Sequence, residues 1–344
     1  MEVKIEDIKI SPILESVHRQ KIDDEVYFSK TYSHYISNSR LKLINPDQGG
    51  SPSIYKKGFT GETTSSLTLG TVIHELFLQP ELFELGPDLN KPSGKLGMVI
   101  DKVVELRKEN KKIKDSIITA CEEIGYYKSS IGASRIKSII KSGLEYYLNR
   151  KGNNFENQIL LSPKDRNIVS NCIRNLKSHN KISKLINPVD MFGDTIESYN
   201  EDAFFIDFKC THEDKECVIK FKMKADNWTI DPENKVITLN DLKTTGHLAC
   251  QFMNGSWNTF HYSRQFASYL YVLLRYCEKE YGYNSEEWTF NCNVIVVETT
   301  ADNRATVFPI TREMLESGRK EFCKLLKMVA YCEMNDYSDD VTFL

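Results

Sequence analysis

The stretch ECVIKFKMKADNWTIDPENKVITLNDLKTT, residues 216–245, decides the fold because it contains two strands and the turn between them. From Ile219 to Asp226, apolar and charged side chains alternate without exception, which is the period of a strand with one buried face. The residues DPEN at 231–234 predict a turn. The alternation resumes in VITLNDLK at 236–243, so the sequence predicts a β-hairpin with one face in the core.

Two carboxylates and a lysine stand at corresponding places in this hairpin. Asp226 ends the first strand, and Asp241 and Lys243 end the second. Residues two apart on a strand share a face and lie some 6–7 Å apart. Carboxylate oxygens are the ligands that Mg²⁺ prefers, and Mg²⁺ can make water nucleophilic beside a phosphate. On the hairpin alone, a metal nuclease and a group of solvated surface charges both remain open.

The rest of the chain predicts a helical half followed by a sheet. Apolar spacing and helix breakers predict helices at 66–79, 97–112, 114–124, 132–149 and 164–178. Further strands are expected at 194–199, 203–210, 289–298 and 304–309, and helices at 262–280 and 311–332. The fold class is therefore α/β (α+β), a mixed central sheet flanked by helices with a helical N-terminal portion. We expect a lead-in at 1–60, one domain at 61–333 (helical part 61–190, sheet-containing core 191–333) and a tail at 334–344.

The composition is that of an ordinary globular protein of 344 residues, 40% of them hydrophobic and 27% charged. No apolar stretch approaches the roughly 20 residues needed to cross a bilayer. The charged N-terminus lacks a signal-peptide core, so we expect a cytoplasmic protein. None of the nine cysteines forms a C-x-x-C pair. This spacing indicates reduced thiols, with an iron–sulfur site built from distant cysteines as the alternative.

The charge is unevenly distributed. The net charge is −3, but residues 95–184 contain nineteen Lys or Arg and nine Asp or Glu. A basic segment in an acidic protein is typical of a track for a phosphate backbone. Solvated helix faces would give the same count, so both interpretations stay open.

Three further side chains are candidates for a site. Gln265 and Tyr269 are four residues apart on an expected helix and so share a face. His74 lies in the otherwise apolar helix GTVIHELFLQP. A purely structural explanation also exists for each. His74 could be a histidine that is hydrogen-bonded within the core, and Gln265 and Tyr269 could form the rim of an amphipathic helix.

Four short sequence blocks, taken in their order along the chain, resemble the RecE-type phage exonucleases (exodeoxyribonuclease VIII) within the RecB-like, PD-(D/E)XK nuclease superfamily. They are G-x-x-I-H (70–74), K-x-K-x-D-x-W (222–228), D-L-K-T-T (241–245) and Q-x-x-x-Y (265–269), preceded by YISNSRLKLINP (35–46). The similarity covers about residues 32–330. Ala225 stands where the superfamily has Pro, and Lys224 where relatives often have Arg.

The resemblance implies a role for each matching position. His74, Asp226, Asp241 and the Leu242 carbonyl would hold the metal, and Lys243 would be the catalytic lysine. The remaining positions would contact DNA or support the site: Gln265, Tyr269, Glu197, Lys222 and Lys224.

The function so implied is a Mg²⁺-dependent exonuclease, with Mn²⁺ able to substitute, that resects linear double-stranded DNA from 5′ to 3′ for recombination. Its implied partners are double-stranded DNA ends, a single-strand annealing protein and copies of itself in a ring, and no membrane. A phage-encoded chain would act in the bacterial host cytoplasm. One alternative is a CRISPR-adaptation or helicase-associated nuclease, although these commonly carry four clustered cysteines. The other is an inactive DNA-binding protein, against which the intact Asp226, Asp241 and Lys243 argue.

Overall fold

The chain divides into two compact units, which are described separately. The computed structural model describes residues 2–58, 69–127, 131–153, 155, 158–190, 192–300 and 302–344. Residues 1–61, 179–296 and 305–344 form the sheet unit, and residues 62–178 and 297–304 form the helical unit.

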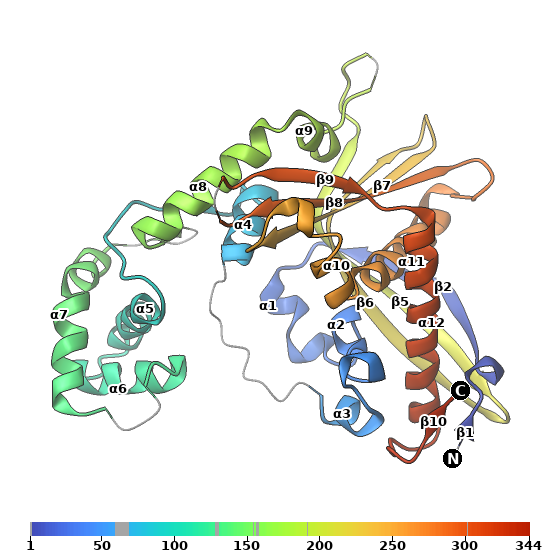
Figure 1. Cartoon of the computed structure of the whole chain (residues 1–344), viewed down its shortest axis with the longest axis horizontal. Coiled ribbons are helices and arrows are strands. Elements are labelled where there is room, and N and C mark those ends of the chain that lie inside the picture. The colour runs from blue at the N-terminus through green and yellow to red at the C-terminus, as the bar shows by residue number, and fades with distance from the viewer. Residues whose placement is uncertain are drawn as a thin grey trace. The chain divides into compact units, whose positions relative to one another are not determined.

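The sheet unit is built on six strands in the order β2-β5-β6-β7-β8-β9 (Figure 1). The strands are β2 (Lys9–Gln20), β5 (Glu197–His212), β6 (Lys215–Asp231), β7 (Val236–Thr245), β8 (Thr289–Glu298) and β9 (Ala305–Pro309). The β2–β5, β5–β6 and β6–β7 pairs are antiparallel. The predicted hairpin is confirmed as β6 and β7, although β6 does not end at Asp226 but continues to Asp231. The fold class of a central sheet flanked by helices is confirmed as well.

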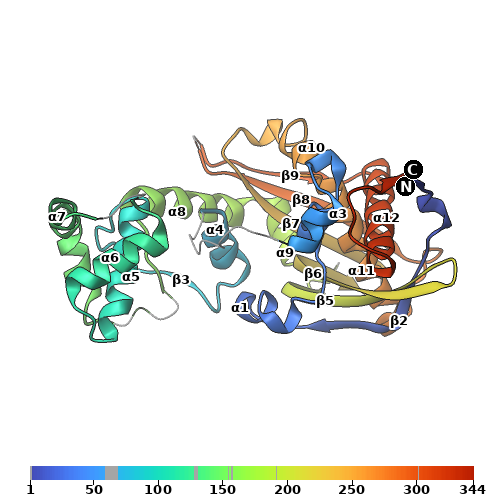
Figure 2. The same cartoon turned by 90° about the horizontal axis from the view of Figure 1, so that it is seen from below.

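Two long helices, α11 (Tyr262–Tyr281) and α12 (Arg312–Met334), pack against each other and against β5 and β6 (Figures 1 and 2). The apolar face of the hairpin supplies core residues such as Phe221 and Met223. A Cβ added at Gly318 of α12 would lie 1.9 Å from the Ser263 carbonyl oxygen, so only glycine permits this close approach of the two helices.

The N-terminal residues belong to the sheet unit and not to a separate lead-in. Strand β2 forms the edge of the sheet, and β1 (Glu2–Val3) pairs in parallel with β10 (Thr342–Phe343). The expected tail therefore contains a strand. Along the chain, β2 is followed by five short helices, of which those labelled η are 3₁₀ helices. They are α1 (Asp24–Tyr27), η2 (Lys30–Tyr32), α2 (Asn38–Leu41), η3 (Pro46–Gln48) and α3 (Pro52–Lys57).

The other short elements of the sheet unit are η1 (Ile5–Asp7), α9 (Asn180–Ile186), η4 (Ala249–Gln251) and α10 (Ser256–Thr259). Helix α9 contacts β6. The second segment of the sheet unit therefore begins at residue 179, whereas the sequence predicted a sheet-containing core from residue 191. The reason is that the apolar face of α9 is buried on the sheet.

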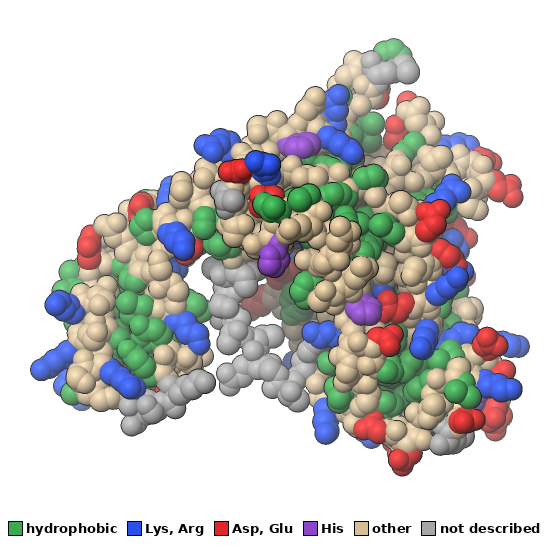
Figure 3. All heavy atoms as spheres, viewed as in Figure 1, with side chains coloured by type: hydrophobic (Ala, Val, Ile, Leu, Met, Phe, Trp, Pro, Cys, Tyr) green, Lys and Arg blue, Asp and Glu red, His purple; other side chains and the backbone are tan. Residues whose placement is uncertain are grey.

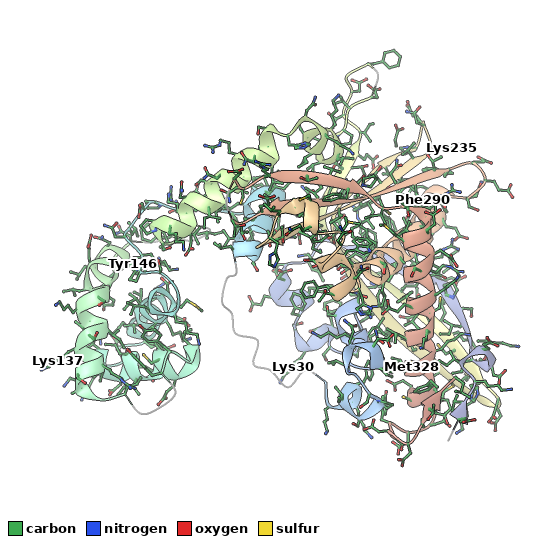
Figure 4. The ribbon with its side chains drawn as sticks, in the orientation of Figure 1. Lys30, Lys137, Tyr146, Lys235, Phe290 and Met328 are labelled. Carbon is green, nitrogen blue, oxygen red and sulfur yellow. The ribbon has the colours of Figure 1, made fainter. Side chains whose placement is uncertain are left out.

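The helical unit contains α4 (Leu69–Leu78), α5 (Lys95–Lys108), α6 (Ile113–Ile124), α7 (Ala133–Arg150) and α8 (Pro163–Ser178), with the short strands β3 (Glu84–Leu85) and β4 (Gln158–Ile159). All five helices were predicted, although residues 66–68 of the first lie outside the described part. Tyr146 points into this unit and donates to Asp101 Oδ1 at 2.6 Å, whereas Lys137 points outward (Figure 4). The helices therefore enclose a core of their own.

Two bulk features complete the description. Among the described residues, no helix combines the length and apolar character that a membrane span requires. All nine cysteines are free thiols, six of them buried, and they are distributed over both units.

Candidate functional site

Three carboxylates lie side by side across β5, β6 and β7. Asn227 and Asn240 form the last paired position of the β6–β7 hairpin. Asp226 and Asp241 follow directly after this pair, and Asp226 accepts a hydrogen bond from the N–H of Leu242, the neighbour of Asp241. On the other side, Glu201 and Asp226 stand opposite each other between the pairs Asn200–Asn227 and Asp202–Ala225. An oxygen of Glu201 and one of Asp226 lie within 4.8 Å of each other. The row of Glu201, Asp226 and Asp241 is called the carboxylate row below.

The carboxylate row lies where the hairpin opens. Beyond Asp226 the free edge of β6 pairs with Ile36 instead of β7: Lys222 N donates to Ile36 O at 2.8 Å. On the other side of the opening, Leu242 N donates to Asp226 Oδ2 at 2.7 Å. The divergence of the strands leaves the carboxylates at an opening in the sheet and fixes the orientation of Asp226.

Buried asparagines hold the strands in register beside the carboxylate row. Asn240 Nδ2 donates to Asn227 Oδ1 at 2.8 Å, and Asn293 Nδ2 donates to Asn240 Oδ1 at 3.0 Å. The three amides form a hydrogen-bonded row across β6, β7 and β8, so these buried polar groups have partners. These bonds fix the strand spacing on which the carboxylate row depends.

Lys243 is the cation of the site. Its ammonium forms an ion pair with Asp241 Oδ2 and lies 5.4 Å from the centre of the Tyr262 ring. Burial works to lower the pKa of Lys243, but the charges of Asp241 and Asp226 outweigh it and raise that pKa above its usual value. Lys243 is therefore protonated at neutral pH and acts as a donor and a positive charge.

The carboxylates are held by neighbouring groups of different kinds. Gln265 Nε2 donates to Asp241 Oδ1 at 2.9 Å, which places α11 directly against the site. Burial raises the pKa of Asp226, although Lys243 and the Leu242 N–H oppose that effect. Burial likewise keeps the phenol of Tyr269 neutral, with a pKa well above its usual value. Gln265 is thus a supporting residue of the site.

Lys224 braces the carboxylate row and does not extend into solvent. Its Nζ lies 3.0 Å from Glu201 Oε2 and 2.6 Å from Asp24 Oδ1, and the side chain is only 12% exposed. Burial works to lower the pKa of Lys224, but the two carboxylates raise it. Its position is that of an internal counter-ion for Glu201.

Lys222 is also buried, inside a group of aromatic rings. Its Nζ donates to the Tyr27 carbonyl at 2.6 Å and lies 4.3 Å from the centre of the Tyr27 ring, with Phe28 and Tyr32 also within 6 Å. The residue is 6% exposed, and burial lowers its pKa to about 8. Lys222 anchors the N-terminal segment to β6, which is a supporting position, and a contact of this residue with DNA remains a prediction.

The lowered pKa of Lys222 predicts a pH-dependent stability. The folded-state pKa of about 8 lies below the usual 10.5, so the unfolded chain binds this proton more tightly. This contribution to stability therefore increases as the pH rises from about 8 toward 10.5. Relative to Lys222→Met, the wild type should gain about 2 kcal/mol between pH 7.5 and pH 10, measured by urea unfolding. Parallel curves for the two proteins would contradict the assignment.

Glu197 lies away from the carboxylate row, and Glu201 takes the place expected for it. Glu197 is exposed at the start of β5, opposite Ile230, and accepts a hydrogen bond of 2.6 Å from the Tyr199 hydroxyl. The sequence predicted two strands, 194–199 and 203–210, with Glu201 in a turn between them. They are one strand, in which Glu201 has a φ of 56°. Glu201 lies four residues after Glu197, and only the β5–β6 register of the folded sheet reveals that it stands opposite Asp226.

His74 lies on α4, which belongs to the helical unit. Its neighbours Val72, Ile73 and Leu76 are buried, as the apolar pattern predicted. The row and its supporting residues all belong to the sheet unit, so the role of His74 as a ligand remains a prediction. The same holds for the Leu242 carbonyl.

The carboxylate row fits a hard divalent cation. Its oxygen donors suit Mg²⁺ or Mn²⁺, and the adjacent ammonium of Lys243 suits an anion beside the metal. Glu201 and Asp226, with oxygens within 4.8 Å of each other, also repel one another unless cations compensate them. The row can therefore hold a cation and place it next to a bound phosphate or carboxylate.

The similarity of this chain to known proteins is structural. No family model matches the chain, and no curated protein matches it. A crystal structure from Eubacterium rectale described as "Putative exonuclease" is similar over 93% of this chain and 88% of its own, with a TM-score of 0.40 and 10% identity. The site described above rests on its own geometry and not on this similarity.

Proposed function

We propose that the protein is a divalent-metal-dependent nuclease that hydrolyses phosphodiester bonds of DNA at the carboxylate row. The observation that carries the proposal is the adjacency of Asp226 and Asp241 across the open end of the hairpin, with protonated Lys243 in an ion pair with Asp241. Acidic groups for a metal and a cation for a phosphate are the two requirements of this reaction. Their presence at one point of one sheet favours catalysis over a surface role.

In the proposed reaction, the carboxylate row, Gln265 and Lys243 have different roles. Bound Mg²⁺ supplies charge neutralisation and a water of lowered pKa. Glu201, Asp226 and Asp241 hold it, and Gln265 keeps Asp241 oriented. Lys243 donates to a phosphate oxygen and stabilises the negative charge that develops there.

Other elements of the proposal rest on the sequence resemblance. His74 and the Leu242 carbonyl are proposed as further ligands, and Mn²⁺ as a substitute for Mg²⁺. The resemblance also supports exonuclease action on linear duplex DNA, 5′ to 3′, to give single-stranded ends for recombination. A ring of several copies, a single-strand annealing partner and action in a bacterial cytoplasm belong to the same proposal.

Digestion of matched linear and circular duplexes tests the function. The linear substrate should carry a label at one 5′ or one 3′ end, and both should be incubated with Mg²⁺ and with excess chelator. An exonuclease releases labelled mononucleotides or short products from the linear form only, and the strand that loses its label first gives the polarity. Cleavage of the circle indicates an endonuclease. Binding without cleavage of either form would support the inactive DNA-binding protein.

The basic segment contributes a pocket to the helical unit. A cavity of about 440 Å³ is lined by Arg107 and Lys108 from the end of α5 and by Arg150 and Lys151 from the end of α7, beside the ring of Phe155. Among the described residues that line this basic pocket, none is acidic. Lysine and arginine side chains are also prominent on the face of this unit that Figure 3 displays. We propose that the basic pocket binds a DNA phosphate.

This proposal predicts a change in the salt dependence of binding. Replacing Lys108 and Lys151 by Gln removes two cations from the basic pocket, so the slope of log K against log salt should become shallower by roughly 2. Lys137→Gln with Lys141→Gln is the matched control, because both lysines are exposed on α7 outside the pocket. Fluorescence anisotropy with duplex DNA at several salt concentrations measures both slopes. Equal slopes for the two double variants would show that the pocket cations are only solvated.

A further inference from the structure

A groove opens beside the carboxylate row on the surface of the sheet unit. It has a volume of about 580 Å³ and lies between the α2–η3 segment and the start of α11. Tyr262 and Gln265 line it, and both also contact the site, at Lys243 and Asp241 respectively. A molecule in this strand groove would therefore continue directly into the site, and the volume is within the usual range for small-ligand sites.

Hydrogen-bond donors are prominent on the floor of the strand groove. Buried Arg264 donates to Asn38 Oδ1 at 2.8 Å and to Gln48 Oε1 at 3.0 Å. Because Arg264 donates to the carbonyl oxygens of both amides, Asn38 and Gln48 would bind a ligand through their NH₂ groups, which are donors. Lys42 and Asp47 also line the groove. This pattern suits a ligand rich in acceptors, such as phosphates and base edges.

Phe260 forms the aromatic wall of the strand groove. The side chain is 58% exposed and lies between this groove and a second cavity of about 370 Å³. Its ring centre is 5.7 Å from that of Tyr262, which stacks on Phe252 at 5.4 Å. An exposed ring braced by the half-buried Tyr262 and the buried Phe252 offers a rigid apolar surface. Proteins bind unpaired bases without sequence preference on such surfaces.

The backbone at the next residue holds Phe260 outward. His261 adopts a left-handed conformation, with φ 52° and ψ 46°, at the N-terminus of α11. This is uncommon for a residue that is not glycine, and it persists where surrounding contacts determine it. Here the contact is from His261 Nδ1 to Glu321 Oε1, at 2.8 Å. The turn directs Tyr262 inward to Lys243 while Phe260 stays exposed.

On the basis of the nuclease function proposed above, we propose that the strand groove receives the DNA strand being cut and that Phe260 stacks on an unpaired base next to the scissile phosphate. The donors on the floor would contact the sugar-phosphate chain and the base edge. Stacking would position the phosphate at Lys243 without selecting a sequence, since every base offers a flat face.

Base stacking can be measured separately from cleavage. In an Asp241→Asn background, an oligonucleotide with 2-aminopurine near its end should bind with quenched fluorescence. Adding Phe260→Ala should remove the quenching and weaken binding roughly 5- to 150-fold. Phe260→Leu should behave like Ala because it keeps an apolar side chain without a flat ring, and Phe260→Trp should retain both signals. Phe192→Ala is the matched control, a ring 83% exposed elsewhere on the sheet unit.

Cleavage then distinguishes the two proposals. With Asp241 intact, one abasic nucleotide near the cut should slow the wild type but make little difference to Phe260→Ala. If the wild type cuts DNA and Phe260→Ala matches Phe192→Ala in both experiments, the stacking role is wrong and the nuclease function stands. If the wild type cuts no DNA with Mg²⁺ or Mn²⁺, the nuclease function fails and the groove's assignment fails with it.

Discussion

Asp241→Asn should abolish DNA cleavage, lowering kcat by roughly three orders of magnitude or more. The side chain lies in the middle of the site, in contact with Lys243 and Gln265. Asparagine keeps an oxygen that can accept the hydrogen bond from Gln265 but removes the negative charge that holds a divalent cation. The fold should therefore survive while metal-dependent turnover is lost. Initial rates on end-labelled linear duplex, with circular dichroism for the fold, measure both.

The control for this experiment is Asp214→Asn. Asp214 is an exposed acid in the turn between β5 and β6, so its replacement changes the net charge equally but leaves the carboxylate row untouched. It should cleave at the wild-type rate. Asp226→Asn should be as inactive as Asp241→Asn, because the two carboxylates are neighbours in the row. Persistent hydrolysis in excess EDTA would overturn the metal mechanism.

Lys243→Ala should lower kcat by about 10²- to 10³-fold while DNA binding changes little. The ammonium is held by Asp241 and raised in pKa by both neighbouring aspartates, so it remains a donor at neutral pH. It interacts more strongly with the charge that develops on the phosphate than with the bound substrate, so its loss affects turnover above all. Single-turnover rates and anisotropy titrations separate the two effects.

Lys235→Ala is the matched control for Lys243→Ala. Lys235 lies at the turn of the same hairpin, where it pairs with Glu287 on the surface (Figure 4). Its removal should leave the rate unchanged. If Lys243→Ala kept a rate close to that of Lys235→Ala, the Asp-Leu-Lys triplet would be a structural ion pair and not part of a catalytic centre.

The hairpin could be predicted because its signals are local. The alternation from Ile219 to Asp226 and the turn at 231–234 determine the strands, and both carboxylates follow from the register. Glu201 could not be found in this way. Its neighbours suggested a turn, and only the long β5–β6 hairpin keeps this segment in a strand despite a positive φ.

The edge strand β2 was not predicted because its sequence lacks a regular alternation of apolar and polar residues. It contains Pro12, and its register with β5 shifts between Ile13 and His18, so no regular alternation appears in its sequence. An edge strand tolerates both features because one side needs no partner. The positions of Lys222 and Lys224 also depend on tertiary structure. The alternation gave their face correctly, but the N-terminal segment that buries them comes from some 200 residues away.

The contacts of Arg264 have a consequence for the order in which the protein becomes active. Its guanidinium is 2% exposed and contacts Asn38 and Gln48 near one end of the chain and Glu321 near the other, at 2.8 Å. A buried arginine without its carboxylate is strongly destabilised, so this corner forms only when α12 has joined the N-terminal segment. Contacts across such sequence separations form slowly. During synthesis, a chain whose helix α12 is still inside the ribosome therefore lacks a finished strand groove, and its site can mature only after that helix has emerged.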